Sequence, residues 1–254
     1  MSRVAVYFCG HIRNMKDTFA NYKRVFSDPN VQFDYYFIFW KVNHSANGPS
    51  WDYLNRTGKK LYDISTVTEE DVYKICPEAK KVILLDEYTL PLNQQKYDQA
   101  MLYQMYSLHQ AFKEIPQGYD LYVRMRPDIY FFTGIHWEYL LKQKDTYQLF
   151  LSTTVHFTKR TYPHTDIFDA FFWISSYEIG KYLADIYLNV EELAKVCRRK
   201  NCEQYFAEYL SRKNVAILNY PFEFALERRT RGFEDNKEET IAYTQRRQKE
   251  GDYV

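Results

Sequence analysis

Apolar and polar positions in the first half of the chain follow two patterns, which are continuous apolar runs and longer segments with helical spacing. Residues 3–10 (RVAVYFCG) and 33–40 (FDYYFIFW) are continuous runs typical of strands buried in a parallel sheet. Residues 15–26 predict a helix between them, and residues 80–88 predict a third strand. The segment TEED at 68–71 has the Thr-x-x-Asp spacing of a helix start. This order is typical of repeated strand and helix units.

A long helix and a fourth strand follow. Residues 93–115 carry apolar side chains at a spacing near 3.6, which predicts a helix that ends at the turn 116–118. YDLYVRMRPDIYF, residues 119–131, has the pattern of a strand. The second half predicts strands within 147–154, 167–175 and 214–222 and helices within 177–199 and 202–213. The alternation predicts an α/β fold with a mainly parallel sheet flanked by helices. We expect a single domain over residues 1–226 and a charged tail over 227–254, either helical or flexible.

The strand at 119–131 ends in three charges. Alternate residues of a strand share a face, so Arg124, Arg126 and Asp128 are expected to point the same way. Three charges can share a buried face only if they pair with one another or with a ligand. A structural Arg–Asp pair would satisfy this condition. Pro127 removes a ladder donor and suits the end of a strand, where open α/β sheets bind their ligands.

Composition narrows the classes of function. Of the 254 residues, 46% are hydrophobic, and 34 basic side chains nearly balance 33 acidic ones, so no overall field favours nucleic acid or an anionic membrane. The apolar run before Gly10 is too short for a signal peptide or a membrane span, so we expect a cytoplasmic protein without a transmembrane segment. The four cysteines form no CxxC pair, which favours free thiols over a zinc site or a disulfide framework.

The charged strand end also carries a family resemblance. YDLYVRMRPDIYF, preceded by QMYSLHQAF, resembles the "YD-hydrophobic-hydrophobic-R-x-R-P-D" block of nucleotide-sugar glycosyltransferases with the GT-A fold, found in bacterial polysaccharide clusters and in large DNA viruses. Other blocks similar to that family occur in the same order, between residues 4 and 218: VAVYFCGHIRN, FDYYFIFWKV, DAFFWISSYEIGKYL and CEQYFAEYLSRKNVAI. The resemblance implies a GT-A (Rossmann-like) enzyme, which we expect in the cytoplasm of the cell or, if the chain is viral, of the host cell. It would move a hexosyl or pentosyl group from a UDP- or GDP-sugar to a hydroxyl of a glycan.

The resemblance also implies a donor site. Gly10, His11 and Arg13 would lie in the first βα loop, where glycine lets the backbone approach the nucleotide and arginine matches a diphosphate. The alternative is that this segment is an ordinary surface loop, in which Arg13 is exposed and binds no nucleotide. The predicted nucleotide-binding residues also include two side chains of the long helix and three of the strand end: Gln104, Ser107, Arg124, Arg126 and Asp128.

Asp128 would take the place of the family's DxD motif, whose carboxylates hold a divalent cation against the diphosphate. Only one acid stands at residues 126–130, so this chain departs from the motif. Either Asp128 alone ligates Mn²⁺ or Mg²⁺, or Arg124 and Arg126 neutralise the leaving diphosphate without a metal. Metal use is the expectation, with metal-independent catalysis as the alternative.

Sugar transfer needs an activated acceptor hydroxyl, and an inverting enzyme supplies a carboxylate as general base. Asp169 and Glu203 lie in the family-like blocks and are the candidates, with Asp166 in reserve. Glu203 is equally explained as a first-turn acid favoured by the helix dipole. Two rival functions remain. One is a non-catalytic carbohydrate- or nucleotide-binding module, motivated by the missing second carboxylate; the other, a methyltransferase, has no GxGxxG after the first strand to support it.

Overall fold

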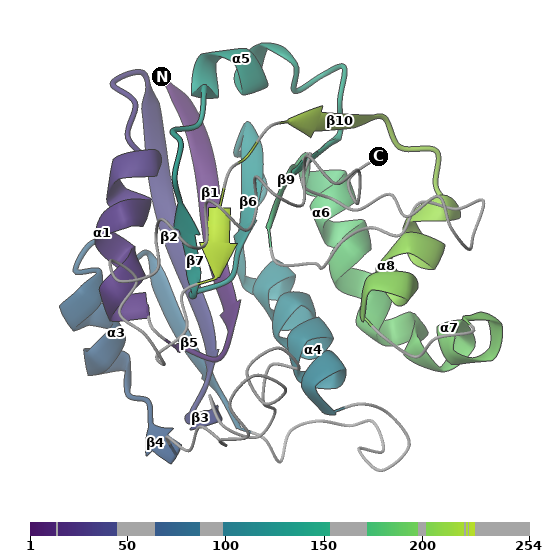
Figure 1. The fold of residues 1–254 in the computed structure, drawn as a ribbon, viewed down its shortest axis with the longest axis horizontal. Helices are drawn as coiled ribbons and strands as arrows, with labels where there is room; N and C mark the ends of the chain where they lie inside the picture. The colour runs from purple at the N-terminus through teal and green to yellow at the C-terminus, as the bar shows by residue number, and fades with distance from the viewer. Residues whose placement is uncertain are drawn as a thin grey trace, which may run out of the picture.

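The chain folds around one mainly parallel sheet (Figure 1). The computed structural model describes residues 1–13, 15–44, 64–86, 99–152, 172–197, 202–220, 222 and 224–226. Seven strands form the sheet in the spatial order β10 (Ile217–Tyr220), β8 (Leu149–Ser152), β9 (Trp173–Ser175), β6 (Leu121–Met125), β1 (Ser2–Gly10), β2 (Val31–Trp40) and β5 (Lys81–Leu85). Only β9 runs against its neighbours in this sheet. The α/β prediction is therefore confirmed.

Both faces of the sheet are buried, which explains why its central strands are continuous apolar runs. Along β1, Val4, Val6 and Phe8 pack into the core on one face, while Tyr7 and Cys9 pack into the core on the other. The parallel register of β1 with β2 and β6 brings the carboxyl ends of these strands to one edge of the sheet. We call this the carboxyl edge and the opposite one the amino edge.

Helices cover the two faces unequally. In Figure 1, α1 and α3 lie on one side of the sheet, and α4 and α6 to α8 lie on the other. The helical segments are α1 (Met15–Val25), α3 (Glu69–Ile75), α4 (Gln99–Glu114), α5 (Trp137–Lys142), α6 (Tyr177–Ala184), the 3-10 helix η2 (Asp185–Asn189), α7 (Val190–Val196) and α8 (Cys202–Ser211). The predicted start of α3 is confirmed, because Thr68 and Asp71 cap each other's backbone N–H groups. No described helix is long and apolar enough to cross a membrane.

The predicted strand at 119–131 is in fact two strands. β6 ends at Met125, a turn follows, and β7 (Ile129–Phe131) pairs antiparallel with β11 (Phe224–Leu226) in a separate small sheet. Pro127 lies in the turn, where its missing N–H costs no ladder bond. A third sheet joins β3 (Val42–His44) to β4 (Ile64–Thr66).

Helix α1 fastens the turn between β6 and β7 through buried side chains. Thr18 donates to the carbonyl of Pro127 at 2.7 Å, and the hydroxyl of Tyr22 donates to that of Arg126 at 3.2 Å. Asn21 exchanges two hydrogen bonds with the backbone of Phe131, at 2.8 and 2.9 Å. The turn that carries the predicted site residues is therefore held in place by the helix that follows the first strand.

Other predictions are confirmed in part. The described part of the predicted helix at 93–115 is α4, and that of the predicted strand at 167–175 is β9. The four cysteines are buried free thiols, as expected. The tail at 227–254 lies outside the described residues, so the expected division of the chain stays a prediction.

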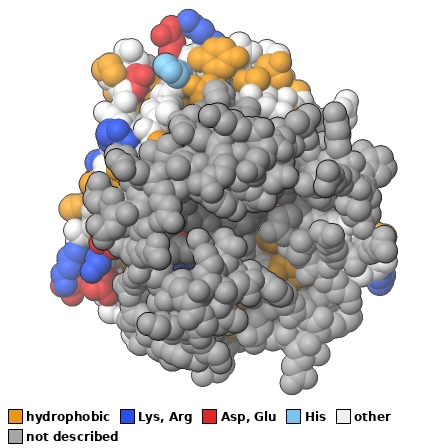
Figure 2. Space-filling model, in the orientation of Figure 1, with side chains coloured by type: hydrophobic (Ala, Val, Ile, Leu, Met, Phe, Trp, Pro, Cys, Tyr) orange, Lys and Arg blue, Asp and Glu red, His pale blue; other side chains and the backbone are white. Residues whose placement is uncertain are grey.

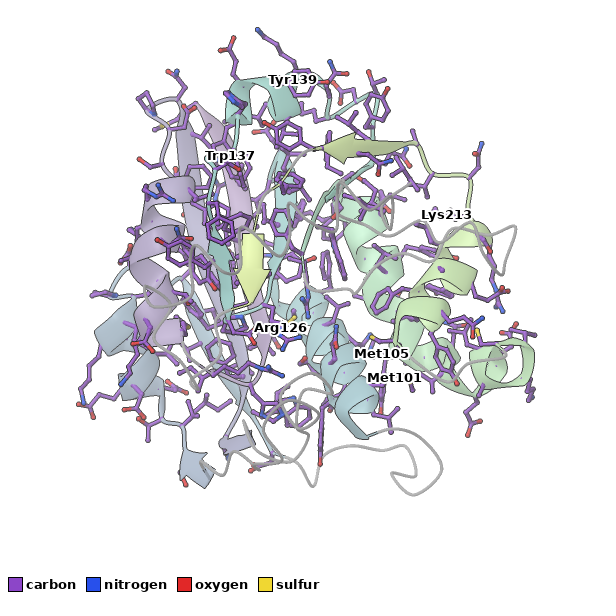
Figure 3. The ribbon with its side chains drawn as sticks, in the orientation of Figure 1. Met101, Met105, Arg126, Trp137, Tyr139 and Lys213 are labelled. Atoms are coloured by element: carbon purple, nitrogen blue, oxygen red, sulfur yellow. The ribbon has the colours of Figure 1, made fainter. Side chains whose placement is uncertain are left out.

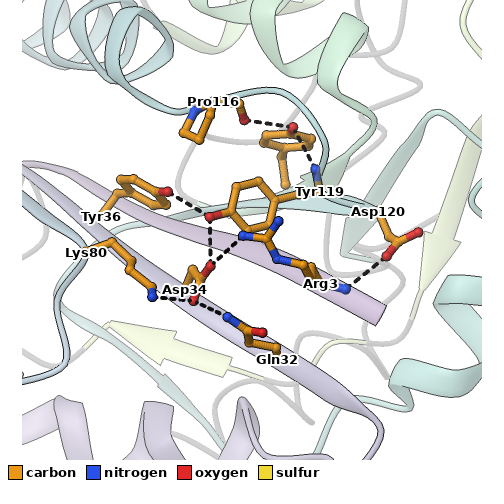
Figure 4. A network of polar contacts seen from close by, with 9 residues as sticks. Arg3, Gln32, Asp34, Tyr36, Lys80, Pro116, Tyr119 and Asp120 are labelled. Carbon is orange, nitrogen blue, oxygen red and sulfur yellow. Dashed lines mark hydrogen bonds and ion pairs between the residues drawn. The ribbon is translucent and has the colours of Figure 1, made fainter. Parts of the chain in front are cut away.

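A polar network closes the amino edge around Asp34 of β2 (Figure 4). The side chain of Asp34 is 3% exposed and accepts from Arg3 at 3.1 Å, Gln32 at 2.9 Å and Tyr119 at 2.8 Å. The ammonium group of Lys80 lies 3.6 Å from the same carboxylate. Burial alone would raise the pKa of Asp34, but the hydrogen bonds outweigh it and lower that pKa.

Candidate functional site at the carboxyl edge

Asp128 joins the first βα loop to the end of β6. The carboxylate is 2% exposed and accepts from Arg126 twice, with Nε at 2.5 Å from Oδ1 and Nη2 at 3.0 Å from Oδ2. Arg13 reaches the same carboxylate, with Nη1 at 2.9 Å from Oδ2. We call Arg13, Arg126 and Asp128 the arginine–aspartate cluster. These three predicted donor residues are joined to one another by ion pairs.

The loop that carries Arg13 has an unusual backbone. Gly10 has a φ of 114°, a conformation that favours glycine, and a Cβ added there would meet no atom of the described residues within 4 Å. Among the described non-glycine residues, Arg13 alone has a positive φ, 49°. This left-handed conformation costs on the order of 1 kcal/mol and persists only where surrounding contacts impose it. As far as the described residues go, the space beside Gly10 is open, which fits the predicted approach of a ligand to the backbone.

Arg124 lies deeper in the core than the arginine–aspartate cluster, on the face of the sheet that α4 covers. It pairs in register with Tyr7 of β1 and Trp173 of β9, and its guanidinium lies 5.5 Å from the centre of the Trp173 ring. The side chain is almost fully buried at 1% exposure. Burial raises the pKa of the Cys9 thiol, whereas Arg124 and Ser107 act against that rise. The structure thus places Arg124 and Ser107 around Cys9, directly before the loop at Gly10.

The predicted side chains of α4 have different positions. Ser107 is fully buried and donates to the carbonyl of Gln104 within the helix, at 3.0 Å. Gln104 itself is half-buried. Ser107 therefore belongs to the layer with Cys9 and Arg124, and the expectation that it directly lines a donor site stays a prediction.

An aromatic wall stands beside the first loop. The ring of His11 lies 6.2 Å from that of Tyr103 on α4, and Tyr103 lies 4.7 Å from Trp40 at the end of β2. Trp40 is fully buried, whereas His11 and Tyr103 are half-buried and therefore accessible. Tyr103 was missed at the level of sequence. Its position four residues before Ser107, on the same helix face, was the available signal.

The predicted catalytic carboxylates are not placed. Asp169 lies outside the described residues, as does Asp166. Glu203 is the second residue of α8, and only its backbone is described. Its position agrees with both the catalytic and the first-turn interpretation, so both roles stay predictions.

A divalent cation does not fit the described donor set. Asp128 is the one carboxylate of the cluster, and both its oxygens already accept from guanidinium groups. Nowhere among the described side chains do three His, Cys, Asp or Glu residues gather as metal ligands. Mg²⁺ and Mn²⁺ prefer oxygen ligands, and adjacent arginines repel them. The expected metal site thus stays a prediction that the geometry does not favour.

A hollow of about 740 Å³ lies at the other end of the molecule, between α5 and β10. Figure 3 shows Trp137 and Tyr139 of α5 at the top of the view and Arg126 in its lower half. In Figure 2, hydrophobic, acidic and basic side chains gather at that upper end. The hollow therefore does not belong to the arginine–aspartate cluster.

The chain matches no protein-family model and no curated protein. Many solved structures are similar at a distance, and three of them illustrate the likeness. The galactosyltransferase LgtC, in complex with donor and acceptor sugar analogues, is 9% identical with a TM-score of 0.46, over 82% of this chain and 70% of that one. Mouse xyloside xylosyltransferase 1 is 8% identical with a TM-score of 0.46, over 86% and 84%. A protein assigned as a nucleotide-diphospho-sugar transferase from Desulfovibrio desulfuricans is 11% identical with a TM-score of 0.43, over 87% and 80%.

Proposed function

We propose that the chain is a glycosyltransferase that moves a sugar from a nucleoside-diphosphate-sugar to a hydroxyl of a glycan. The arginine–aspartate cluster carries this proposal. It joins the first βα loop to the end of β6 at the carboxyl edge, where open α/β sheets bind nucleotides. Arginine is the side chain best suited to a diphosphate, because its planar fork donates to two oxygens at once.

The start of α1 supports the same placement of the diphosphate. The helix begins at Met15, two residues beyond Arg13, and its first turn contacts the turn at Pro127 through Thr18. Helix N-termini offer unpaired N–H groups and a positive dipole end to an anion. The diphosphate would therefore meet backbone and guanidinium donors together. The half-buried rings of His11 and Tyr103 offer a surface on which the base can stack.

The reaction follows from this arrangement. The acceptor oxygen forms a bond to the anomeric carbon as the bond from that carbon to the diphosphate oxygen breaks. The nucleoside diphosphate leaves with the electron pair, and its added charge is stabilised by Arg13 and Arg126. In an inverting transfer, the hydroxyl proton passes to a carboxylate, for which we propose Asp169 or Glu203.

Sugar transfer tests the proposal. The purified protein is incubated with UDP-, GDP-, CMP- and dTDP-sugars and a panel of glycans, and nucleotide release and product mass are measured. We expect one nucleotide family to support turnover that Arg126→Ala abolishes and Lys213→Ala, an exposed-lysine control, leaves unchanged. Nucleotide binding without any transfer or hydrolysis would favour the non-catalytic binding module. Absence of binding by the UDP-, GDP- and dTDP-sugars would overturn the proposal, since a CMP-sugar carries a monophosphate.

A further inference from the structure

We infer that Asp128 is a positioning residue, which holds Arg13 and Arg126 as a fork for the donor's diphosphate, and that donor binding here needs no divalent cation. This inference rests on the proposed function, because it concerns how the same site holds its donor. Asp128 was expected to bind a metal ion. Under the inference it instead acts on the donor indirectly, through Arg13 and Arg126.

Occupancy of the Asp128 carboxylate is the first argument. A carboxylate offers about four lone-pair directions. Three are used by Arg13 Nη1 at 2.9 Å and by Arg126 Nε and Nη2 at 2.5 and 3.0 Å. A cation bound to Asp128 would have to displace at least one guanidinium and then lie next to it. An anion would displace no hydrogen bond of Asp128 and would be attracted by the guanidinium groups of Arg13 and Arg126.

The local charge is the second argument. Among the described side chains, the cluster comprises two guanidiniums and one carboxylate, so its sum is 2 − 1 = +1, and Arg124, buried in the core beside Trp173, adds a third guanidinium behind it. A nucleoside diphosphate carries a charge of comparable size and opposite sign. In metal-dependent sites a divalent cation supplies this neutralisation. Here the arginines supply it.

The shape of the cluster is the third argument. Exposure rises from Asp128 at 2% through Arg126 at 11% to Arg13 at 33%, so the buried anion has a mostly buried guanidinium beside it and a partly exposed one toward solvent. Arg13 also holds the positive φ of 49° while it makes this contact. Strained backbone of this kind concentrates at ligand sites, where surrounding contacts maintain it. Asp128 thus orients Arg13 toward a ligand.

Calorimetric titration with UDP, GDP and dTDP, in EDTA and in Mn²⁺, tests the inference. We expect the wild-type dissociation constant for the bound nucleotide to agree within about threefold between the two conditions. Arg13→Ala should weaken binding about 10- to 100-fold in both, the value of one to two charged hydrogen bonds. Asp128→Asn keeps the size of the side chain and should weaken binding about 10-fold in both, because the fork loses its anchor.

The matched control is Arg3→Ala, which removes an arginine from the other buried aspartate, Asp34. It should leave nucleotide affinity unchanged. Arg13→Lys keeps the charge without the fork, and we expect an affinity between wild type and Arg13→Ala. Arg13 is one-third exposed, so these variants keep the test valid even if Asp128→Asn fails to fold.

The outcomes separate the two proposals. Binding that requires Mn²⁺ and loses its Mn²⁺ dependence in Asp128→Asn would overturn the inference and leave the proposed function intact. Equal binding in EDTA that does not respond to Arg13→Ala would overturn the role of the fork. No nucleotide binding by the wild-type protein in either condition would overturn the proposed function, and the inference with it.

Discussion

Two buried aspartates with arginine partners lie at opposite edges of the sheet. Asp34 at the amino edge and Asp128 at the carboxyl edge are 3% and 2% exposed. Asp34 receives donors of mixed kinds, including Gln32 and the hydroxyl of Tyr119 (Figure 4). The donors that reach Asp128 in the cluster are guanidiniums.

We infer that the difference is one between a group that stabilises the fold and a group that prepares a site. Asp34 is shared by neutral donors and by Arg3 and Lys80, whose side chains are 47% and 51% exposed, so solvent screens these two cations and the network mainly orders the ends of strands. The two arginines on Asp128 are less exposed, at 11% and 33%, so their positive charge is screened less, and it lies at the edge where open α/β sheets bind ligands. Equal burial therefore has different consequences at the two edges.

The largest expected effect is that of Arg126→Ala. The substitution removes two of the three hydrogen bonds from the arginines of the cluster to a carboxylate that is 2% exposed. We expect a loss of about 3 kcal/mol in the free energy of unfolding, as for a broken buried ion pair. For a chain of this size, that corresponds to a fall in Tm of roughly 6–12 °C. Differential scanning calorimetry measures it.

Arg3→Ala is the matched substitution at the amino edge. Arg3 is 47% exposed, and Asp34 keeps Gln32, Tyr119 and Lys80 after its loss. We expect a smaller fall in Tm than for Arg126→Ala. An equal or larger fall would show that the two aspartates depend on their arginines alike and would remove the contrast between the edges.

Asp34→Asn comes second in size. The amide keeps the shape but loses the charge and accepts fewer of the four contacts, so we expect a loss of about 2 kcal/mol in the free energy of unfolding. Urea denaturation measures this loss, and nucleotide affinity should stay at the wild-type value. A parallel loss of nucleotide affinity would mean that the amino edge also shapes the site.

The same variant makes the pH dependence measurable. The folded-state pKa of Asp34 is lowered below the unfolded value, which is about 3.9. Its contribution to stability is therefore complete above about pH 4 and is lost as the pH falls through the lower folded-state pKa. We expect the stability difference between wild type and Asp34→Asn to be constant from about pH 5 to 7 and to shrink below about pH 4. A difference that grows on acidification would contradict the lowered pKa.

The fold was largely predictable from the sequence because its central strands are buried on both faces. Continuous apolar runs at 3–10 and 33–40 report that burial directly, and both are strands. The break within 119–131 was not predictable from alternation, because β6 and β7 have similar apolar patterns. Their separation depends on bonds from α1 to the turn, which are contacts between distant parts of the chain.

The site was predictable only as a set of charges. Sequence spacing indicated that Arg124, Arg126 and Asp128 share a face. Because the strand ends at Met125 and a turn follows, Asp128 instead contacts Arg13, 115 residues away in the sequence. Arg124 instead remains in the core beside Trp173. Register and turn geometry decide such partnerships, and single-sequence patterns do not contain them.

The smallest expected effect sharpens the description of the amino edge. The hydroxyls of Tyr36 and Tyr119 lie 2.7 Å apart, and Tyr119 donates its one proton to Asp34, so Tyr36 must donate to Tyr119. Burial, together with Tyr36 and Asp34, raises the pKa of Tyr119, so this donor stays protonated. Tyr36→Phe removes the hydrogen bond from Tyr36 to Tyr119 and should lower the free energy of unfolding by about 1 kcal/mol.

Tyr119→Phe should lower the free energy of unfolding by more, about 2 kcal/mol. It removes the hydrogen bond to Asp34 and also leaves the Tyr36 hydroxyl without its acceptor. Urea denaturation of both single variants and of the double variant gives the coupling between them. We expect the double variant to cost less than the sum, since the two hydroxyls form one chain. Additive losses, or a larger cost for Tyr36→Phe, would show that the hydrogen bonds do not run in this direction, and that Asp34 is held mainly by its charged partners, as Asp128 is.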